Sequence, residues 1–170
     1  MLGNSTKILT RAGVIAGLYA VLSLITFPVA SGAIQLRVSE ALTLLPLLYI
    51  EAVPALFVGC AIINLITGCA IFDVVLGSLI TLIAGICTYL IGKFIKNTPL
   101  RVILGGLFPV ALNAFLLPLI WLLCYGTGEY VYALQALFLI ISQSLAVYGG
   151  GTFLYIGIKK LKAKGIAFLE

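Results

Sequence analysis

The sequence of 170 residues contains no histidine, and charged residues make up only 9% of it. Globular domains carry about a quarter charged residues, so a soluble domain is excluded as the body of this chain. Without histidine, the chain lacks the commonest metal ligand and the commonest general base. Its four cysteines lie within or beside apolar stretches without metal-type spacing, at Cys60, Cys69, Cys87 and Cys124. We interpret them as small buried side chains and expect neither a metal nor a cofactor.

Motifs for energy coupling and catalysis are also missing. The string nearest to a phosphate-binding loop runs from Gly85 to Lys93, but its spacing is wrong and it lies in an apolar stretch. The sequence offers no paired carboxylates on one helix face and no nucleophile beside a base. We therefore predict that the chain is not an enzyme. Any uphill transport would need an ion gradient or a partner protein as its energy source.

Apolar residues, in contrast, make up 63% of the chain. Six membrane spans of about 20 residues would use about 120 residues and leave only short connections. The sequence predicts an all-α integral membrane protein, with residues 1–170 forming one domain. The expected helices cover residues 8–27, 39–49, 55–66, 73–94, 102–123 and 130–158, each to within a few residues.

The basic residues lie at the ends of these apolar stretches. Ten Lys and Arg against five Asp and Glu give a net charge of +5, but they form no continuous patch, which argues against nucleic-acid binding. Three basic clusters stand out: Lys7 with Arg11, residues 93–101, and residues 159–164. Basic clusters near spans face the cytoplasm. Six spans place all three on that side, so we expect a multi-pass cell-membrane protein with cytoplasmic N- and C-termini.

Small residues recur along the first helix at four-residue steps. Ala12, Ala16 and Ala20 form one row, and Gly13 and Gly17 form a second row beside it. In lipid, such spacing lets two helix backbones approach closely. The strip packs either against helices of the same chain or against a partner protein.

Polar side chains at membrane depth are few, and such residues usually face a cavity or a partner. Most map near the outer ends of the predicted spans. Acids, amides and aromatic rings together are typical of a site for a planar nitrogenous molecule. The candidate substrate-binding residues are Gln35, Arg37, Glu40, Asn64, Asp73, Asn113, Trp121 and Glu129.

Structural roles compete with ligand binding at several of these positions. Arg37 and Glu40 are three residues apart, which also fits a local ion pair. Asp73 is placed to cap a helix, Trp121 to join an interfacial aromatic belt, and Asn113 to link two helices. Glu51, on a turn at the cytoplasmic side, is expected to be solvated.

Three segments resemble the QueT family, the substrate-binding S components of energy-coupling-factor (ECF) transporters for queuosine precursors. They are the stretches from Arg37 to Pro46, Asn64 to Gly68 and Phe72 to Leu79, and the similarity extends over essentially the whole chain. The row from Ala12 to Ala20 is also similar to the motif by which S components dock on the coupling subunit.

The resemblance implies a six-helix S-component bundle that binds its substrate near the extracellular face, under the loop after the first helix. It also implies a transmembrane coupling subunit and two ABC-type ATPases as partners, and toppling of the S component to release its cargo. The substrate implied is a queuosine precursor, with hydroxymethylpyrimidine or another vitamin-like ring as alternatives. From the residues alone, a solitary gradient-driven transporter and a membrane scaffold also stay open.

Overall fold

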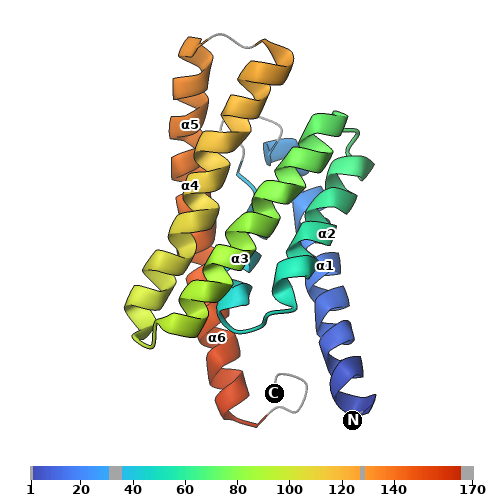
Figure 1. Cartoon of the computed structure of the whole chain (residues 1–170), viewed down its shortest axis with the longest axis vertical. Coiled ribbons are helices and arrows are strands. Elements are labelled where there is room, and N and C mark those ends of the chain that lie inside the picture. The colour runs from blue at the N-terminus through green and yellow to red at the C-terminus, as the bar shows by residue number, and fades with distance from the viewer. Residues whose placement is uncertain (1, 31–35, 127–128, 166–170) are drawn as a thin grey trace.

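The chain folds into a bundle of helical rods (Figure 1). The computed structural model describes residues 2–30, 36–126 and 129–165, and this part contains helices and no strands. The elements are α1 (Leu2–Ala30), η1 (Val38–Leu47), α2 (Ala52–Ile66), η2 (Asp73–Gly77), α3 (Ser78–Phe94), α4 (Thr98–Tyr125), α5 (Glu129–Ser144), η3 (Leu145–Gly151) and α6 (Thr152–Ala163). η1 is a 3₁₀-helix, whereas η2 and η3 are π-helical turns that continue into α3 and α6.

Four rods are long and apolar enough to cross a membrane. They cover Ser5–Pro28, Asp73–Phe94, Thr98–Cys124 and Val131–Ala163. The other two, η1 and α2, have 10 and 15 residues. They extend over about 20 and 22 Å, short of the roughly 30 Å hydrocarbon core of a bilayer. The predicted all-α membrane bundle is therefore confirmed, but only four of the six predicted spans have the length of a full crossing.

The outer surface of the long helices is apolar. On α3, Leu79, Ile83, Ile86 and Leu90 are 40% to 49% exposed and recur at helical spacing along one face. A continuous apolar face of this kind would be costly in water. It fits a helix that faces lipid.

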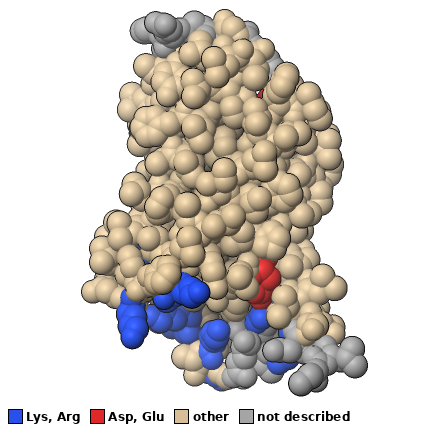
Figure 2. Space-filling view, viewed as in Figure 1, with Lys and Arg blue, Asp and Glu red and all other residues tan. Residues whose placement is uncertain are grey.

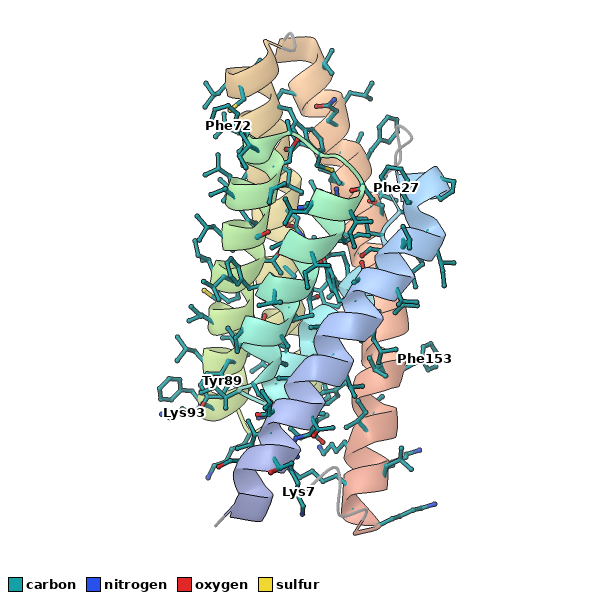
Figure 3. The ribbon with its side chains drawn as sticks, turned by 90° about the vertical axis from the view of Figure 1, so that its right-hand side faces the viewer. Lys7, Phe27, Phe72, Tyr89, Lys93 and Phe153 are labelled. Atoms are coloured by element: carbon teal, nitrogen blue, oxygen red, sulfur yellow. The ribbon has the colours of Figure 1, made fainter. Side chains whose placement is uncertain are left out.

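Lys and Arg gather at one end of the molecule, and the rest of the visible surface is almost free of charge (Figure 2). α1 begins, α3 ends, α4 begins and α6 ends there, and Lys7 and Lys93 mark this end in Figure 3. Lys159 Nζ donates to Thr98 Oγ1 at 2.8 Å, which brings the last basic cluster to the middle one. This arrangement, called the basic end below, confirms that the three clusters lie together. That it faces the cytoplasm stays a prediction.

Two basic side chains at this end are tied to the backbone or to another charge. Arg101 donates from Nη2 to the carbonyls of Leu47, at 2.9 Å, and Gly92, near the ends of η1 and α3. Helix C-termini leave carbonyls without partners, so this guanidinium satisfies two of them. Arg11 pairs with Glu51 at 2.7 Å, and both side chains are less than 10% exposed. The expectation that Glu51 is solvated was therefore wrong.

The short helix η1 lies in the middle of the bundle, and most of its residues are buried. Glycines surround it closely. A Cβ at Gly151 would lie 2.9 Å from the carbonyl oxygen of Ala41, and one at Gly92 would lie 2.8 Å from Cα of Leu47. Both positions therefore require glycine. This close fit holds Glu40, near the start of η1, at a fixed position inside the bundle.

Candidate substrate site

A cavity of about 270 Å³ lies between the helices. Its lining includes Phe27 and Asp73. Phe27, and Phe72 directly before Asp73 in the sequence, lie toward the end of the bundle away from Lys7 and Lys93 (Figure 3). Among the described residues, the lining consists of Tyr19, Ser23, Phe27, Arg37, Glu40, Cys60, Ile63, Asn64, Thr67, Cys69, Asp73, Gly77, Thr81, Asn113, Leu117 and Trp121. The cavity is thus built by α1, η1, α2, η2, α3, α4 and the segments that join them.

Glu40 stands at the centre of a buried hydrogen-bond network. Its side chain is 1% exposed. The Tyr19 hydroxyl donates to Oε1 at 2.6 Å, and Asn113 Nδ2 donates to Oε2 at 3.2 Å. A buried carboxylate is costly unless donors satisfy it. Each oxygen keeps a further lone pair, so the carboxylate can still accept from a ligand.

Asp73 supplies a second carboxylate to the same cavity. The indole Nε1 of Trp121 donates to Asp73 Oδ1 at 2.9 Å, which connects η2 to α4. Asp73 and Gly77 both lie on the π-helical turn η2 and both line the cavity. π-turns within helices occur frequently at functional sites. Phe72 already has helical dihedral angles (φ −65°, ψ −39°), so Asp73 lies within the helix and not at the N-cap position that the capping interpretation requires.

Two asparagines present polar groups to the cavity. Asn64 is 7% exposed, and its Nδ2 donates to the Asp73 carbonyl at 3.3 Å and to Cys60 Sγ at 3.6 Å. Asn113 is 4% exposed and uses its Nδ2 toward Glu40. In both residues the amide nitrogen is used by the protein. The carbonyl oxygens are therefore the groups that these amides can offer to a ligand.

Arg37 brings a cation to this acceptor-rich wall. It is partly exposed and lines the cavity just before η1. Among the described residues, no ion pair within 4.0 Å joins Arg37 to Glu40. The two side chains therefore do not form a direct ion pair, and the local-pair interpretation is not confirmed. The guanidinium is a donor group in the lining of the cavity.

The structure brings six of the eight predicted substrate-binding residues into one cavity: Arg37, Glu40, Asn64, Asp73, Asn113 and Trp121. Trp121 thus faces the cavity and bonds to Asp73, and Asn113 both links helices and lines the cavity. Gln35 and the side chain of Glu129 lie outside the part of the chain that the structure describes.

Sequence reasoning missed several residues of the cavity, although their spacing carried a signal. Tyr19 and Ser23 are four residues apart on α1, and Cys60, Asn64 and Thr67 follow at steps of four and three on α2. Polar or hydroxyl-bearing residues at these steps share one helix face. In helices otherwise surrounded by lipid, such a face points inward.

The two rows of small residues on α1 have different surroundings. Ala12, Ala16 and Ala20 are partly buried and pack against the core between α1 and α2. A Cβ at Gly59 would lie 2.9 Å from the carbonyl oxygen of Ala16, so the two backbones touch there. Gly13 and Gly17, in contrast, are exposed, and a Cβ at either position would meet nothing within 4 Å. The alanine row packs within the chain, and the glycine row faces outward.

A bundle of apolar helices around a small cavity lined by a few charged and amide side chains is typical of membrane proteins that bind a solute inside the helix bundle. The comparisons with known proteins agree with this class. A family model described as QueT transporter matches residues 9–160, so the chain belongs to the QueT family of S components of ECF transporters. It is therefore a transporter component rather than an enzyme. Comparison with curated proteins and with solved structures found no match.

Proposed function

We propose that this chain is the membrane subunit that captures a queuosine precursor, a deazaguanine bearing an aminomethyl group, for an ECF-type importer. Family membership supports the role of a substrate-specific S component. The chemistry of the cavity supports the choice of ligand. The decisive observation is that two carboxylates and a guanidinium, from Glu40, Asp73 and Arg37, line one cavity.

The charges favour a cationic ligand. Two carboxylates and one guanidinium leave a formal charge of −1 in the cavity. A charge inside a membrane protein needs a partner, and an aminomethyl group, which is an ammonium at neutral pH, supplies one. Hydroxymethylpyrimidine carries no such cation. The charge balance therefore favours the deazaguanine.

The pattern of donors and acceptors points the same way. The carboxylates of Glu40 and Asp73 and the carbonyl oxygens of the two asparagines are acceptors, and Arg37 is a donor. A deazaguanine has a donor edge formed by a ring N–H and an amino group, and a ring carbonyl that accepts. We assign the donor edge to Glu40 and Asn113, the carbonyl to Arg37, and the ammonium to Asp73.

The size of the cavity fits a single small ring system. Pockets for drug-sized ligands start at about 300 Å³, and the cavity here has about 270 Å³. Phe27 and Trp121 belong to its lining and offer ring faces against which a flat heterocycle can stack. A ligand much larger than a two-ring base would need the helices to separate.

Energy would come from partners. S components of this family work with ECF transporter modules. We propose a transmembrane coupling subunit and two ABC-type ATPases, with the outward row of Gly13 and Gly17 as the docking face on α1. The alanine row beside it holds α1 against α2 and so keeps this face in place.

Ligand capture tests the proposal. The chain purified in detergent is titrated by calorimetry with 7-aminomethyl-7-deazaguanine and with hydroxymethylpyrimidine, and copurifying small molecules are identified by mass spectrometry. We expect binding of the deazaguanine and no comparable binding of the pyrimidine. Binding of the pyrimidine alone would refute the ligand assignment but leave the S-component role standing.

A further inference from the structure

The side-chain amide of Asn113 uses both of its N–H groups within the protein. Its Nδ2 donates to Glu40 Oε2 at 3.2 Å and to Gln143 Oε1 at 3.4 Å. An amide carries two N–H donors and one carbonyl acceptor. The carbonyl oxygen Oδ1 is thus what remains for a ligand, and no described residue donates a hydrogen bond to it. The orientation of this amide decides whether the cavity wall offers an acceptor or a donor at this point.

Gln143 contributes to that orientation from outside the cavity. It lies on α5, is 1% exposed and does not belong to the cavity lining. If the Asn113 amide turned over, its Oδ1 would face two acceptors, Glu40 Oε2 and Gln143 Oε1, and both hydrogen bonds would be lost. Leaving buried donors and acceptors unpaired is costly. The two acceptors together therefore hold one orientation.

We propose that Gln143 is a positioning residue that sets substrate specificity, a role that rests on the proposed capture of a deazaguanine. By holding the Asn113 amide, it keeps Oδ1 beside the Glu40 carboxylate as a second acceptor. The pair then selects a ligand whose edge carries a ring N–H next to an amino group. A ligand without that amino group leaves Oδ1 of the buried Asn113 unpaired, which lowers its affinity.

Calorimetry with a matched pair of ligands tests this role on the whole chain in detergent. The pair is 7-aminomethyl-7-deazaguanine and the analogue that lacks only the exocyclic amino group. Wild type should prefer the first. Gln143→Met keeps the approximate shape but removes the acceptor, and this preference should fall about two- to tenfold, the factor that one neutral hydrogen bond is worth. Gln143→Glu restores an acceptor and should restore the preference.

A purely structural role would give a different result. Gln143→Met would then weaken both ligands by the same factor and leave their ratio unchanged, which would overturn the proposal. A folded Gln143→Glu protein that has lost the preference would also overturn the proposal. This test holds even if Gln143→Met cannot be purified. Gln135→Met is the matched control, because Gln135 lies on the same helix and its Oε1 accepts no hydrogen bond within the described part of the chain. It should leave the ratio as in wild type.

A measurement without ligand separates this proposal from the proposed function. The chain contains four asparagines, Asn4, Asn64, Asn97 and Asn113, so selective ¹⁵N-asparagine labelling gives few side-chain amide signals. The signal that is lost in Asn113→Asp belongs to Asn113. We expect Gln143→Met to shift one of its two amide protons and Gln135→Met to shift neither. If wild type binds neither of the two deazaguanines, the proposed function is wrong. If the Asn113 amide signals do not shift in Gln143→Met, the positioning role is wrong.

Discussion

At the scale of single residues, Glu40 is the group on which we expect ligand recognition to depend most. Tyr19 and Asn113 donate to different oxygens of its carboxylate. In Glu40→Gln the remaining oxygen can accept from Asn113, and the new amide nitrogen can donate to the Tyr19 hydroxyl, which is also an acceptor. Glu40→Gln should therefore keep the fold but lose a charge-assisted hydrogen bond to the ligand. We expect a loss of affinity of about ten- to a hundredfold for 7-aminomethyl-7-deazaguanine, measured by calorimetry. Unchanged affinity would make Glu40 a structural residue.

Asp73 provides the matched comparison, because Asp73→Asn keeps Oδ1 as the acceptor for Trp121 Nε1 and removes only the charge. If Asp73 binds the ammonium, this change should weaken the aminomethyl compound but leave the uncharged 7-cyano analogue unaffected. Glu40→Gln should weaken both, because both carry the same donor edge. Titration of the two variants with the two ligands checks this. Equal losses in all four titrations would contradict separate roles for the two carboxylates.

A second prediction at the scale of single residues concerns the buried ion pair of Arg11 and Glu51. The side chains of Arg11 and Lys162 lie over the ring of Tyr49, at 4.8 Å and 5.3 Å from the ring centre. Burial raises the pKa of the Tyr49 hydroxyl, so the ring stays neutral between these cations. The contacts connect the start of α1 to the turn before α2 and the end of α6.

Breaking this pair should destabilise the protein strongly. Arg11→Ala leaves the Glu51 carboxylate buried without its partner, which costs roughly 3–5 kcal/mol. Thermal unfolding in detergent should show a clear decrease in the midpoint. The double change Arg11→Met with Glu51→Gln leaves no unpaired charge and should unfold at a higher temperature than Arg11→Ala. The opposite order would mean that the pair contributes little.

Much of the site was predictable residue by residue, because polar groups at membrane depth are costly and therefore rarely accidental. Arg37, Glu40 and Asp73 were found in this way. Tyr19 was missed because a tyrosine in an apolar helix is most simply taken as part of the core. Only the crossing of α1 with η1 shows that its hydroxyl reaches Glu40.

At the scale of elements, the sequence predicted where helices occur but not which kind they are. The expected segments 39–49 and 55–66 correspond to η1 and α2. Close contacts with other helices determine that η1 is a 3₁₀-helix and that α3 and α6 begin with π-turns. Such contacts join residues far apart in the chain, so local propensity does not reveal them.

The contact between η3 and η1 leads to a prediction about glycine. A Cβ at Gly151 would lie 2.9 Å from the Ala41 carbonyl oxygen, so Gly151→Ala must push two helices apart. Overpacking of this kind costs typically 1–3 kcal/mol. Gly157→Ala, six residues later, places its Cβ in open space and should be neutral or slightly stabilising. Thermal unfolding of the two variants should separate them, and equal midpoints would show that η1 can move at no cost.

At the scale of the whole molecule, the gathering of Lys and Arg at one end makes orientation testable (Figure 2). The positive-inside rule places this end in the cytoplasm. In a cysteine-free chain, Asn97→Cys at the basic end should react with a membrane-impermeant reagent only after permeabilisation. Ile71→Cys, an exposed position next to Phe72 at the opposite end, should react in intact cells. The reverse pattern would invert the topology and place the cavity near the cytoplasm.

A second prediction at the scale of the whole molecule concerns assembly with the coupling module. The exposed row of Gly13 and Gly17 on α1 offers the position at which to test it. Ala16 is a poor position for this purpose, because its backbone touches α2 and a large side chain there would disturb the packing of α1 on its neighbours. Gly17 is better, since a side chain there points into open space and leaves the chain's own packing intact. Gly17→Leu should therefore fold normally and bind the ligand with wild-type affinity.

The same Gly17→Leu variant should fail to assemble, because a leucine keeps the partner helix from approaching the backbone of α1. Copurification with a tagged coupling subunit and its two ATPases measures this directly, and uptake by whole cells should fall with it. Gly157→Leu is the matched control: it also replaces a helical glycine that faces open space, but on α6. It should assemble and transport as wild type does. If Gly17→Leu also assembles and transports normally at equal expression, the coupling subunit docks on another face of the bundle.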